Sequence, residues 1–185
     1  MPLASPRNWW QPFNREERLW FYIITAWAFI MFLMMPLGHL WNQNVPQETY
    51  KTTPAEFKQV TDDFIAKYQR KDGQGNPVLM SGLEVVDAPA GKDAFLIAQA
   101  WKFRPVLVLK KGQTYRVHMS SLDFQHGFSL QPQNLNLQIL PDYSYVVTLQ
   151  PNEAGTFHIV CNEYCFYAGP QMGHDTMVGR IIVEE

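Results

Sequence analysis

The chain has 185 residues, a formal net charge of −2 at pH 7 and only two cysteines. Acidic and basic residues are mixed along it, and the absence of a basic patch excludes an obvious nucleic-acid-binding protein. Outside an apolar N-terminal segment, the chain is long enough for one ordinary domain with its own core.

The apolar segment runs from Leu19 to Gly38, where 20 consecutive residues carry no charge. A helix of this length would be about 30 Å long, which matches the hydrocarbon core of a bilayer. Trp20 and Trp41 lie near its ends, where aromatic rings favour the headgroup layer. A cleaved signal peptide would have a shorter apolar region followed by small residues. We therefore expect residues 1–42 to be a cytoplasmic N-terminus and a retained transmembrane anchor.

The charges around this segment predict its orientation. Arg7, Arg15 and Arg18 precede it, whereas Lys51 is the only Lys or Arg in the 15 residues that follow it. The positive-inside rule then places the N-terminus in the cytoplasm and the C-terminal domain in the periplasm or outside the cell. The expected localisation is single-pass in the inner or cytoplasmic membrane.

One helix is predicted within residues 43–92, which we expect to be a linker. Thr53 and Glu56 have the spacing of a capping box, and Pro54 occupies the first helical position. Apolar residues then recur at helical spacing, at Phe57, Val60, Phe64 and Tyr68. This pattern predicts a short amphipathic helix packed on a neighbour.

From residue 93 to the C-terminus the pattern changes to short apolar runs with a period of two. Turn residues separate the runs, and this spacing is typical of an all-β sandwich. The seven expected strands lie within residues 94–103, 105–112, 114–121, 134–140, 143–150, 155–161 and 178–185.

Alternation along these strands divides the histidines into two groups. His118 and His158 are expected to point away from the core, as surface or hydrogen-bonding residues. His126 lies at a strand end beside Gly127, which would let another backbone approach closely. His174 follows the two cysteines in a loop.

The segment CNEYCFYAGPQMGHDTM, from Cys161 to Met177, contains both cysteines, one histidine and two methionines. Soft thiolate, imidazole and thioether ligands select copper. Tetrahedral zinc and a disulfide in an oxidising compartment are the alternatives, although a thioether such as Met177 has no use at a zinc site. The candidate cluster consists of His126, Cys161, Cys165, His174 and Met177.

This segment resembles the copper-A loop of subunit II of the haem-copper oxygen reductases, Cys-x3-Cys-x3-His-x2-Met followed by a final strand. DFQHGFSL resembles the segment that carries the family's first histidine ligand, and AWKFRPVLVLKKGQTYRVHMSS resembles the strands before it. The single membrane helix is most similar to the ba3-type (B-family) subunit II. The resemblance implies a cupredoxin-like Greek-key sandwich over residues 93–185, with one N-terminal transmembrane helix and a short connecting helix.

The resemblance also implies roles for the cluster. Cys161 and Cys165 would be thiolates that bridge two copper ions, and His126 and His174 would be the terminal imidazole ligands.

Weaker ligands and an electron path follow from the same resemblance. Met177 and the backbone carbonyl of Glu163 would be axial ligands, and the Glu163 side chain would reach a magnesium ion at a subunit interface. Trp101 and Phe103 correspond to an aromatic region that faces the electron donor.

The chain departs from the family pattern in one place. Eight residues, 166–173, separate the second cysteine from the histidine, against three in the family. One hypothesis is an excursion, turned by Gly169 and Pro170, that returns His174 to its ordinary place. The other is a mononuclear blue-copper site that uses a single thiolate. The retained cysteine spacing favours the first, and Met172 is then expected to pack within the loop.

The function implied is electron transfer in a terminal respiratory haem-copper oxidase. Electrons would pass from cytochrome c or a similar donor through copper-A to the haems of subunit I, where oxygen is reduced. No catalytic residue is expected in this chain, although it would be a subunit of a cytochrome-c oxidase-type oxidoreductase. The alternatives are the same role in a nitric oxide reductase and a membrane-tethered copper carrier or assembly protein.

Overall fold

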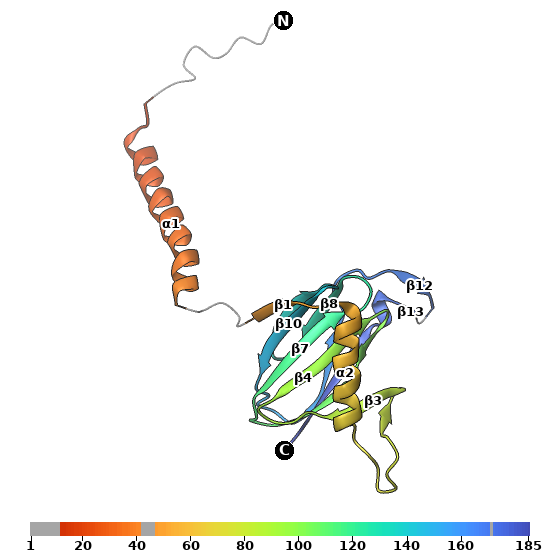
Figure 1. Cartoon of the computed structure of the whole chain (residues 1–185). Helices are drawn as coiled ribbons and strands as arrows, with labels where there is room; N and C mark the ends of the chain where they lie inside the picture. The colour runs from red at the N-terminus through yellow and green to blue at the C-terminus, as the bar shows by residue number, and fades with distance from the viewer. Residues whose placement is uncertain (1–11, 42–46, 171) are drawn as a thin grey trace, which may run out of the picture. The chain divides into compact units, whose positions relative to one another are not determined.

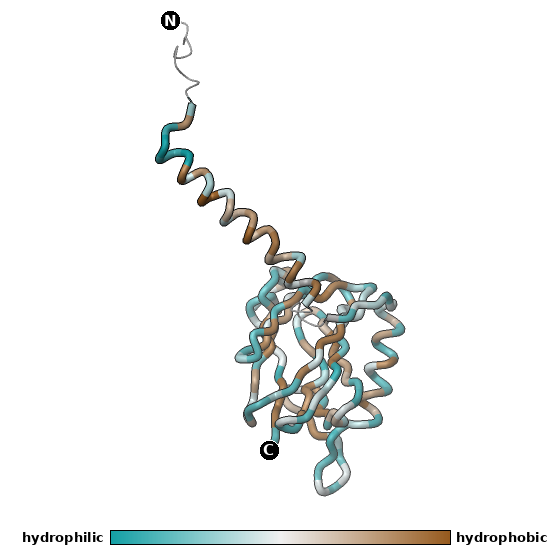
Figure 2. Tube along the Cα trace, turned by 90° about the vertical axis from the view of Figure 1, so that its left-hand side faces the viewer, coloured by the Kyte–Doolittle hydropathy of each residue, from teal (hydrophilic) through white to brown (hydrophobic). Residues whose placement is uncertain are grey.

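The computed structural model describes residues 12–41, 47–170 and 172–185 and separates two compact units, one up to Val45 and one from Pro46. The first unit contains α1, Arg15–Leu40, in which Pro36 is accommodated near the C-terminal end. Its stretch Arg15–Gly38 is long and apolar enough to cross a membrane (Figure 2). Its large side chains are exposed. Asn14 and Glu17 cap its N-terminus reciprocally, each backbone amide donating to the other's side chain at 2.8 Å.

The second unit is a sandwich of two β-sheets (Figure 1). The five-stranded sheet has the order β1-β10-β7-β4-β5, and the larger one has the order β2-β3-β6-β14-β11-β8-β9. Most neighbours are antiparallel, but β4 pairs with β7, and β6 with β3 and β14, in parallel. The strands of the first sheet are β1 (Gln47–Lys51), β4 (Asp93–Gln99), β5 (Lys102–Arg104), β7 (Tyr115–Ser121) and β10 (Tyr143–Leu149). Those of the second are β2 (Leu79–Met80), β3 (Leu83–Asp87), β6 (Val106–Lys110), β8 (His126–Leu130), β9 (Leu135–Ile139), β11 (Gly155–Val160) and β14 (Val178–Glu184).

The main core lies between the two sheets and is formed by alternate residues of their strands. It includes Leu96, Val117, Met119, Phe128 and Ile159, each no more than 1% exposed. Both cysteines and Met177 belong to the same buried cluster. The ligand-bearing end of the sandwich is therefore continuous with its apolar core.

A third layer covers the outer face of the five-stranded sheet, where α2, Pro54–Tyr68, lies across β4 and β7 (Figure 1). The predicted capping box is confirmed, with Thr53 and Glu56 bonded reciprocally. Phe57 and Phe64 pack against Phe95 of β4, with ring centroids 6.0 and 5.6 Å apart. This packing explains the helical spacing of the aromatic residues.

Two features of the strands were not foreseen from the sequence. Residues 43–92 were expected to be a linker, and the described part of that range, from residue 47, also supplies β1 and β3 to the two sheets. His118 points away from the main core, as expected, but it packs against Tyr50 of β1 and Phe95 of β4 and is only 7% exposed. Its ring Nδ1 lies 2.9 Å from the Tyr50 hydroxyl and its Nε2 lies 3.1 Å from Asp93. His158 is exposed, as predicted.

Candidate metal centre

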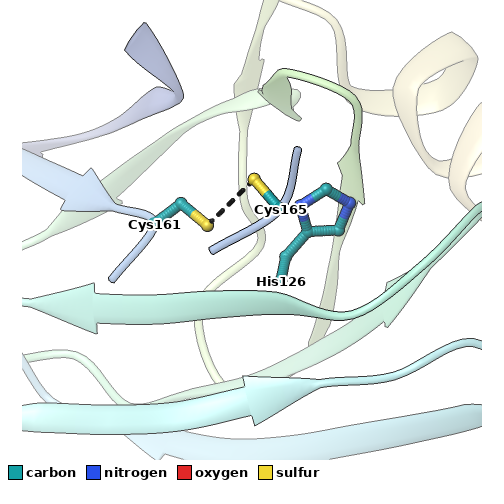
Figure 3. A group of neighbouring side chains, drawn as sticks. All are labelled: His126, Cys161 and Cys165. Atoms are coloured by element: carbon teal, nitrogen blue, oxygen red, sulfur yellow. Dashed lines mark hydrogen bonds between the residues drawn. The ribbon is translucent and has the colours of Figure 1, made fainter. Parts of the chain in front are cut away.

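The site forms at one end of the sandwich, where two strands of the larger sheet lead into loops. β8 begins with His126, and β11 ends immediately before Cys161. The Cys161 amide donates to the Met177 carbonyl at 3.2 Å, which joins the two ends of the second loop. Strand pairing thus brings together residues that are far apart in the sequence (Figure 3).

The cysteine loop passes close to Gly127 of β8, which is the close backbone approach that the sequence predicted. A Cβ atom there would lie 2.6 Å from the Glu163 nitrogen and 2.7 Å from the Asn162 nitrogen, closer than real Cβ atoms approach. The absent side chain lets the Gly127 amide donate to the sulfur of Cys161 at 3.3 Å. Glycine is therefore required by the close approach of the backbones.

Two free thiols lie at the centre of the site. Cys161 is 2% and Cys165 is 0% exposed, and their sulfur atoms are 3.5 Å apart (Figure 3). A disulfide would require about 2.05 Å. The carbonyl oxygen of Glu163 lies 3.2 Å from the Cys161 sulfur. The pair consequently presents two sulfur donors and one carbonyl oxygen in one small volume.

His126 offers a ring nitrogen to this volume. Its Nε2 is 2.7 Å from Asp123 Oδ1, whereas its buried Nδ1 has no hydrogen-bond partner. One nitrogen of His126 and both sulfurs lie within 4.8 Å of one another. An unpartnered buried nitrogen is costly, and a metal ion next to the thiols would supply the missing interaction.

The C-terminal end of the loop adds two more donors. His174 Nδ1 is 3.9 Å and Met177 Sδ is 3.8 Å from the Cys165 sulfur. Met177 is completely buried, and His174 is half-buried. The structure thus brings together all six residues that the sequence nominated as metal ligands.

The long loop is accommodated as a small hairpin. The Phe166 carbonyl accepts from the His174 amide at 3.0 Å, which closes the loop at its base. Phe166 has a positive φ of 65°, and this left-handed conformation turns the chain outward. Beyond it, β12 (Tyr167–Gly169) pairs with β13 (Met172–Gly173), so the additional residues project from the ligand cluster.

Hydrogen bonds distinguish the two thiols. Burial raises the pKa of Cys161, but the neighbouring imidazoles of His126 and His174 and the hydrogen bond from the Gly127 amide outweigh it and lower the pKa to about 6. Burial and the neighbouring Cys161 raise the pKa of Cys165 to about 12. The pair therefore releases one proton readily and holds the second until a cation replaces it.

Asp123 is a site residue that the sequence analysis missed. Burial lowers the pKa of His126, yet the hydrogen bond to Asp123 outweighs this effect and raises the pKa overall. Burial likewise opposes the ionised form of Asp123, but hydrogen bonds from His126 and from two backbone amides hold the pKa of its carboxyl below the ordinary value. The spacing Asp-x2-His was the available signal.

No family model matches the chain. It is 28% identical to cytochrome c oxidase subunit 2 of Thermus thermophilus over 102 residues, which span 55% of this chain and 72% of the relative. A second relative with the same description, from a named strain of that organism, has the same identity over 102 residues and is covered over 58% of its length. Among solved structures, a chain of a heme-copper terminal oxidase dimer aligns with a TM-score of 0.57 and 19% identity, over 92% of this chain and 100% of that one.

The chain is a homologue of subunit II of cytochrome c oxidase. The predicted β-sandwich, with one N-terminal candidate span and one short helix, is confirmed. The homology and α1 together support a single-pass membrane protein.

The remaining nominated residues of this subunit II homologue differ in exposure. Trp101 is half-buried, and its indole nitrogen donates to the Cys165 carbonyl at 2.9 Å. Phe103 is 1% exposed in the core, so it has almost no surface to present to a partner. The Glu163 carboxylate accepts from the Gln138 side chain at 3.0 Å. Met172, expected to pack within the loop, is 55% exposed.

Proposed function

We propose that this chain is the electron-transfer subunit of a terminal haem-copper oxidase and that its cluster holds a binuclear copper-A centre. One observation carries the proposal: two buried free thiols with sulfurs 3.5 Å apart, surrounded by imidazole, thioether and carbonyl donors. A zinc site would leave the thioether and the carbonyl without a role. The unpartnered His126 Nδ1 is a further donor that fits the same group.

Each ligand in this proposal has one role. Cys161 and Cys165 would bridge the two ions, and His126 and His174 would bind one each. Met177 and the carbonyl of Glu163 would be the weak axial ligands. When bound, the copper pair would supply a one-electron carrier.

The residues of the chain determine how that carrier would behave. Both sulfurs and the Met177 thioether are buried, so water is kept from them. The Gly127 amide at 3.3 Å donates to one sulfur, and such hydrogen bonds tune a metal thiolate. Attachment of both loops to paired strands fixes the donors before an ion or an electron arrives.

Oxygen reduction in this proposal belongs to a partner chain. The apolar run from Leu19 to Gly38 contains no histidine that could bind a haem within the membrane. The partner is therefore a haem-bearing subunit I. With the N-terminus in the cytoplasm, the sandwich would lie in the periplasm or outside the cell. The Glu163 carboxylate is a candidate magnesium ligand at the interface with that partner.

An uncharged aromatic surface beside the cluster is the proposed docking face for a cytochrome c or a similar donor. Tyr164, Phe166, Tyr167 and Met172 are 55–74% exposed, and residues 164–173 include no charged side chain. The Tyr164 ring centroid is 6.1 Å from that of His174. Exposed apolar patches of this kind mark interaction sites. Trp101 donates to the Phe166 carbonyl of this surface at 3.2 Å, whereas Phe103 is buried in the core.

The test is purification of the full chain from its native membrane under mild conditions. The proposal predicts co-purification with a haem-containing partner, and oxygen consumption when a reduced cytochrome c is supplied. Turnover of nitric oxide in place of oxygen would show that the chain serves a nitric oxide reductase instead of an oxidase. Isolation of the chain alone, with copper that exchanges readily and no haem, would contradict the proposal and favour a copper carrier.

A further inference from the structure

The turn between β4 and β5 touches both loops that carry the candidate ligands. On one side, the Ala100 amide donates to Asp123 Oδ2 at 2.8 Å. The other oxygen of Asp123 is the one that lies 2.7 Å from His126 Nε2. Ala100 thus reaches the first histidine through a single carboxylate.

On the other side, the next residue reaches the cysteine loop. The indole N–H of Trp101 donates to the carbonyl of Cys165 at 2.9 Å and to that of Phe166 at 3.2 Å. The same Phe166 carbonyl accepts from the His174 amide. Trp101 therefore binds the loop at the point where the hairpin leaves the ligand cluster.

We propose that the Ala100–Trp101 turn is a positioning element that sets the spacing between His126 and the Cys165–His174 half of the cluster. The turn contributes no ligand itself. It acts through two short hydrogen-bonded links, one that ends on a ligand side chain and one that ends on the backbone of the ligand loop. The inference builds on the proposed copper site, but the links themselves exist in the metal-free protein.

The length of the loop explains why such an element is needed. Longer loops have more conformations to lose when their ends are fixed, and eight residues separate Cys165 from His174. Backbone pairing closes the hairpin at its base but does not connect it to the β8 side of the site. The Phe124 and Phe166 rings touch across the two sides, with centroids 5.1 Å apart, and the Ala100–Trp101 turn adds hydrogen bonds to both from a third segment of the chain.

The direct test in the parent protein is exchange of the Trp101 indole proton in the full-length, metal-free chain. Trp101 is the only tryptophan after Trp41, and its resonance is identified by its absence from Trp101→Phe. A hydrogen bond to two carbonyls predicts exchange much slower than that of a solvent-exposed indole. Exchange as fast as that of a free indole would overturn the proposal, whether or not the protein binds copper.

The second test compares copper retention in Trp101→Phe, which keeps an aromatic ring but has no N–H group. Trp27→Phe in α1 is the matched control. We expect Trp101→Phe to lose copper to a chelator roughly tenfold faster than the parent, as loss of a buried hydrogen bond implies, with an altered copper spectrum. The control is expected to match the parent. Unchanged copper loss and an unchanged spectrum in folded Trp101→Phe would contradict a positioning role.

The outcomes also separate this inference from the function on which it builds. A parent chain that binds no copper contradicts the proposed function, and indole exchange still decides whether the turn holds the loop. If the sandwich of Trp101→Phe does not fold, the resonance can still be identified, because every other tryptophan lies within the first 41 residues, and the exchange measurement on the parent then decides alone.

Discussion

The ligand cluster and the β12–β13 hairpin belong to the same loop but differ sharply in their surroundings. Cys161, Cys165 and Met177 are at most 2% exposed, whereas Tyr167 and Met172 of the hairpin are 58% and 55% exposed. The cluster is held by paired strands and by hydrogen bonds from three segments of the chain. The hairpin is held mainly at its base. An insertion can therefore enlarge a ligand loop without moving the ligands, provided that its two ends are joined.

The largest effect is expected when a candidate metal ligand is removed from the buried cluster. Cys165→Ala deletes one of the two thiolates proposed to bridge the copper ions, so we expect complete loss of the binuclear copper signature. Copper analysis and paramagnetic resonance on the loaded chain measure the effect. Met172→Ala, which removes an exposed thioether from the hairpin, is the control and is expected to keep the signature. Loss of the signature in the control would assign Met172 to the cluster.

A methyl group at the close approach of β8 and the cysteine loop should have the next largest effect. Gly127→Ala places a Cβ against the backbone nitrogens of Asn162 and Glu163. We expect a loss of about 1–3 kcal/mol in the free energy of unfolding, typical of overpacking, together with weaker copper binding. Chemical denaturation and a copper titration provide the measurements.

Gly73→Ala is the matched control for that substitution, because nothing lies within 4 Å of its added Cβ. It should be nearly neutral. Equal effects at the two glycines would show that the close approach at Gly127 does not matter.

Two buried methionines allow the effect of losing a thioether ligand to be distinguished from the effect of a change in core packing. Met177→Leu and Met119→Leu each replace a side chain that is at most 1% exposed by one of similar size. Both should cost less than about 1.5 kcal/mol of stability. Only Met177→Leu is expected to alter the absorption spectrum of the copper-loaded protein. Identical spectra for the two variants would remove Met177 from the ligand set.

An ion pair of the sandwich, outside the cluster, predicts how the stability of the protein depends on pH. The hydrogen bond from Arg104 outweighs burial and lowers the pKa of Glu84 from 4.5. A lowered carboxyl pKa stabilises the folded state above pH 4.5, and this contribution is lost as the pH falls through the folded-state value. Glu84→Gln should thus be less stable than the parent at pH 7, with a difference that shrinks at pH 3. A stability difference that grows as the pH falls would contradict a lowered pKa for Glu84 in the folded state.

The smallest effect on the cluster is expected when the hairpin itself is removed. Deletion of residues 167–171 restores three residues between Cys165 and His174. Because the cluster does not depend on the hairpin, the copper spectrum should be nearly unchanged, while reduction by the donor protein should slow. Stopped-flow reduction measures the second effect. Loss of the copper site, with an unchanged rate of reduction by the donor protein, would mean that the hairpin supports the cluster and does not serve the donor.

The parts of the molecule that were predictable from sequence are those with local signals. The apolar run of α1, the capping box at Thr53 and the strand periodicity each depend on neighbouring residues. The candidate ligands were found because most of them lie within residues 161–177 and because His126 precedes a glycine in a distinctive segment.

The parts that were not predicted depend on contacts between distant segments. The pairing of β1 with β10 and the burial of His118 against Tyr50 leave no local pattern. The same is true of the links from Ala100 and Trp101 to the two ligand loops. Sequence spacing identified the donors, but only the fold shows what holds them.

The central claim is that both cysteines serve one shared copper centre despite the inserted residues. The most direct measurement is the electron paramagnetic resonance spectrum of the copper-loaded, oxidised full-length protein. Hyperfine splitting from two equivalent copper nuclei is the predicted result. Splitting from a single nucleus would mean that the long loop supports a mononuclear site, and the bridging role of Cys161 and Cys165 would be wrong.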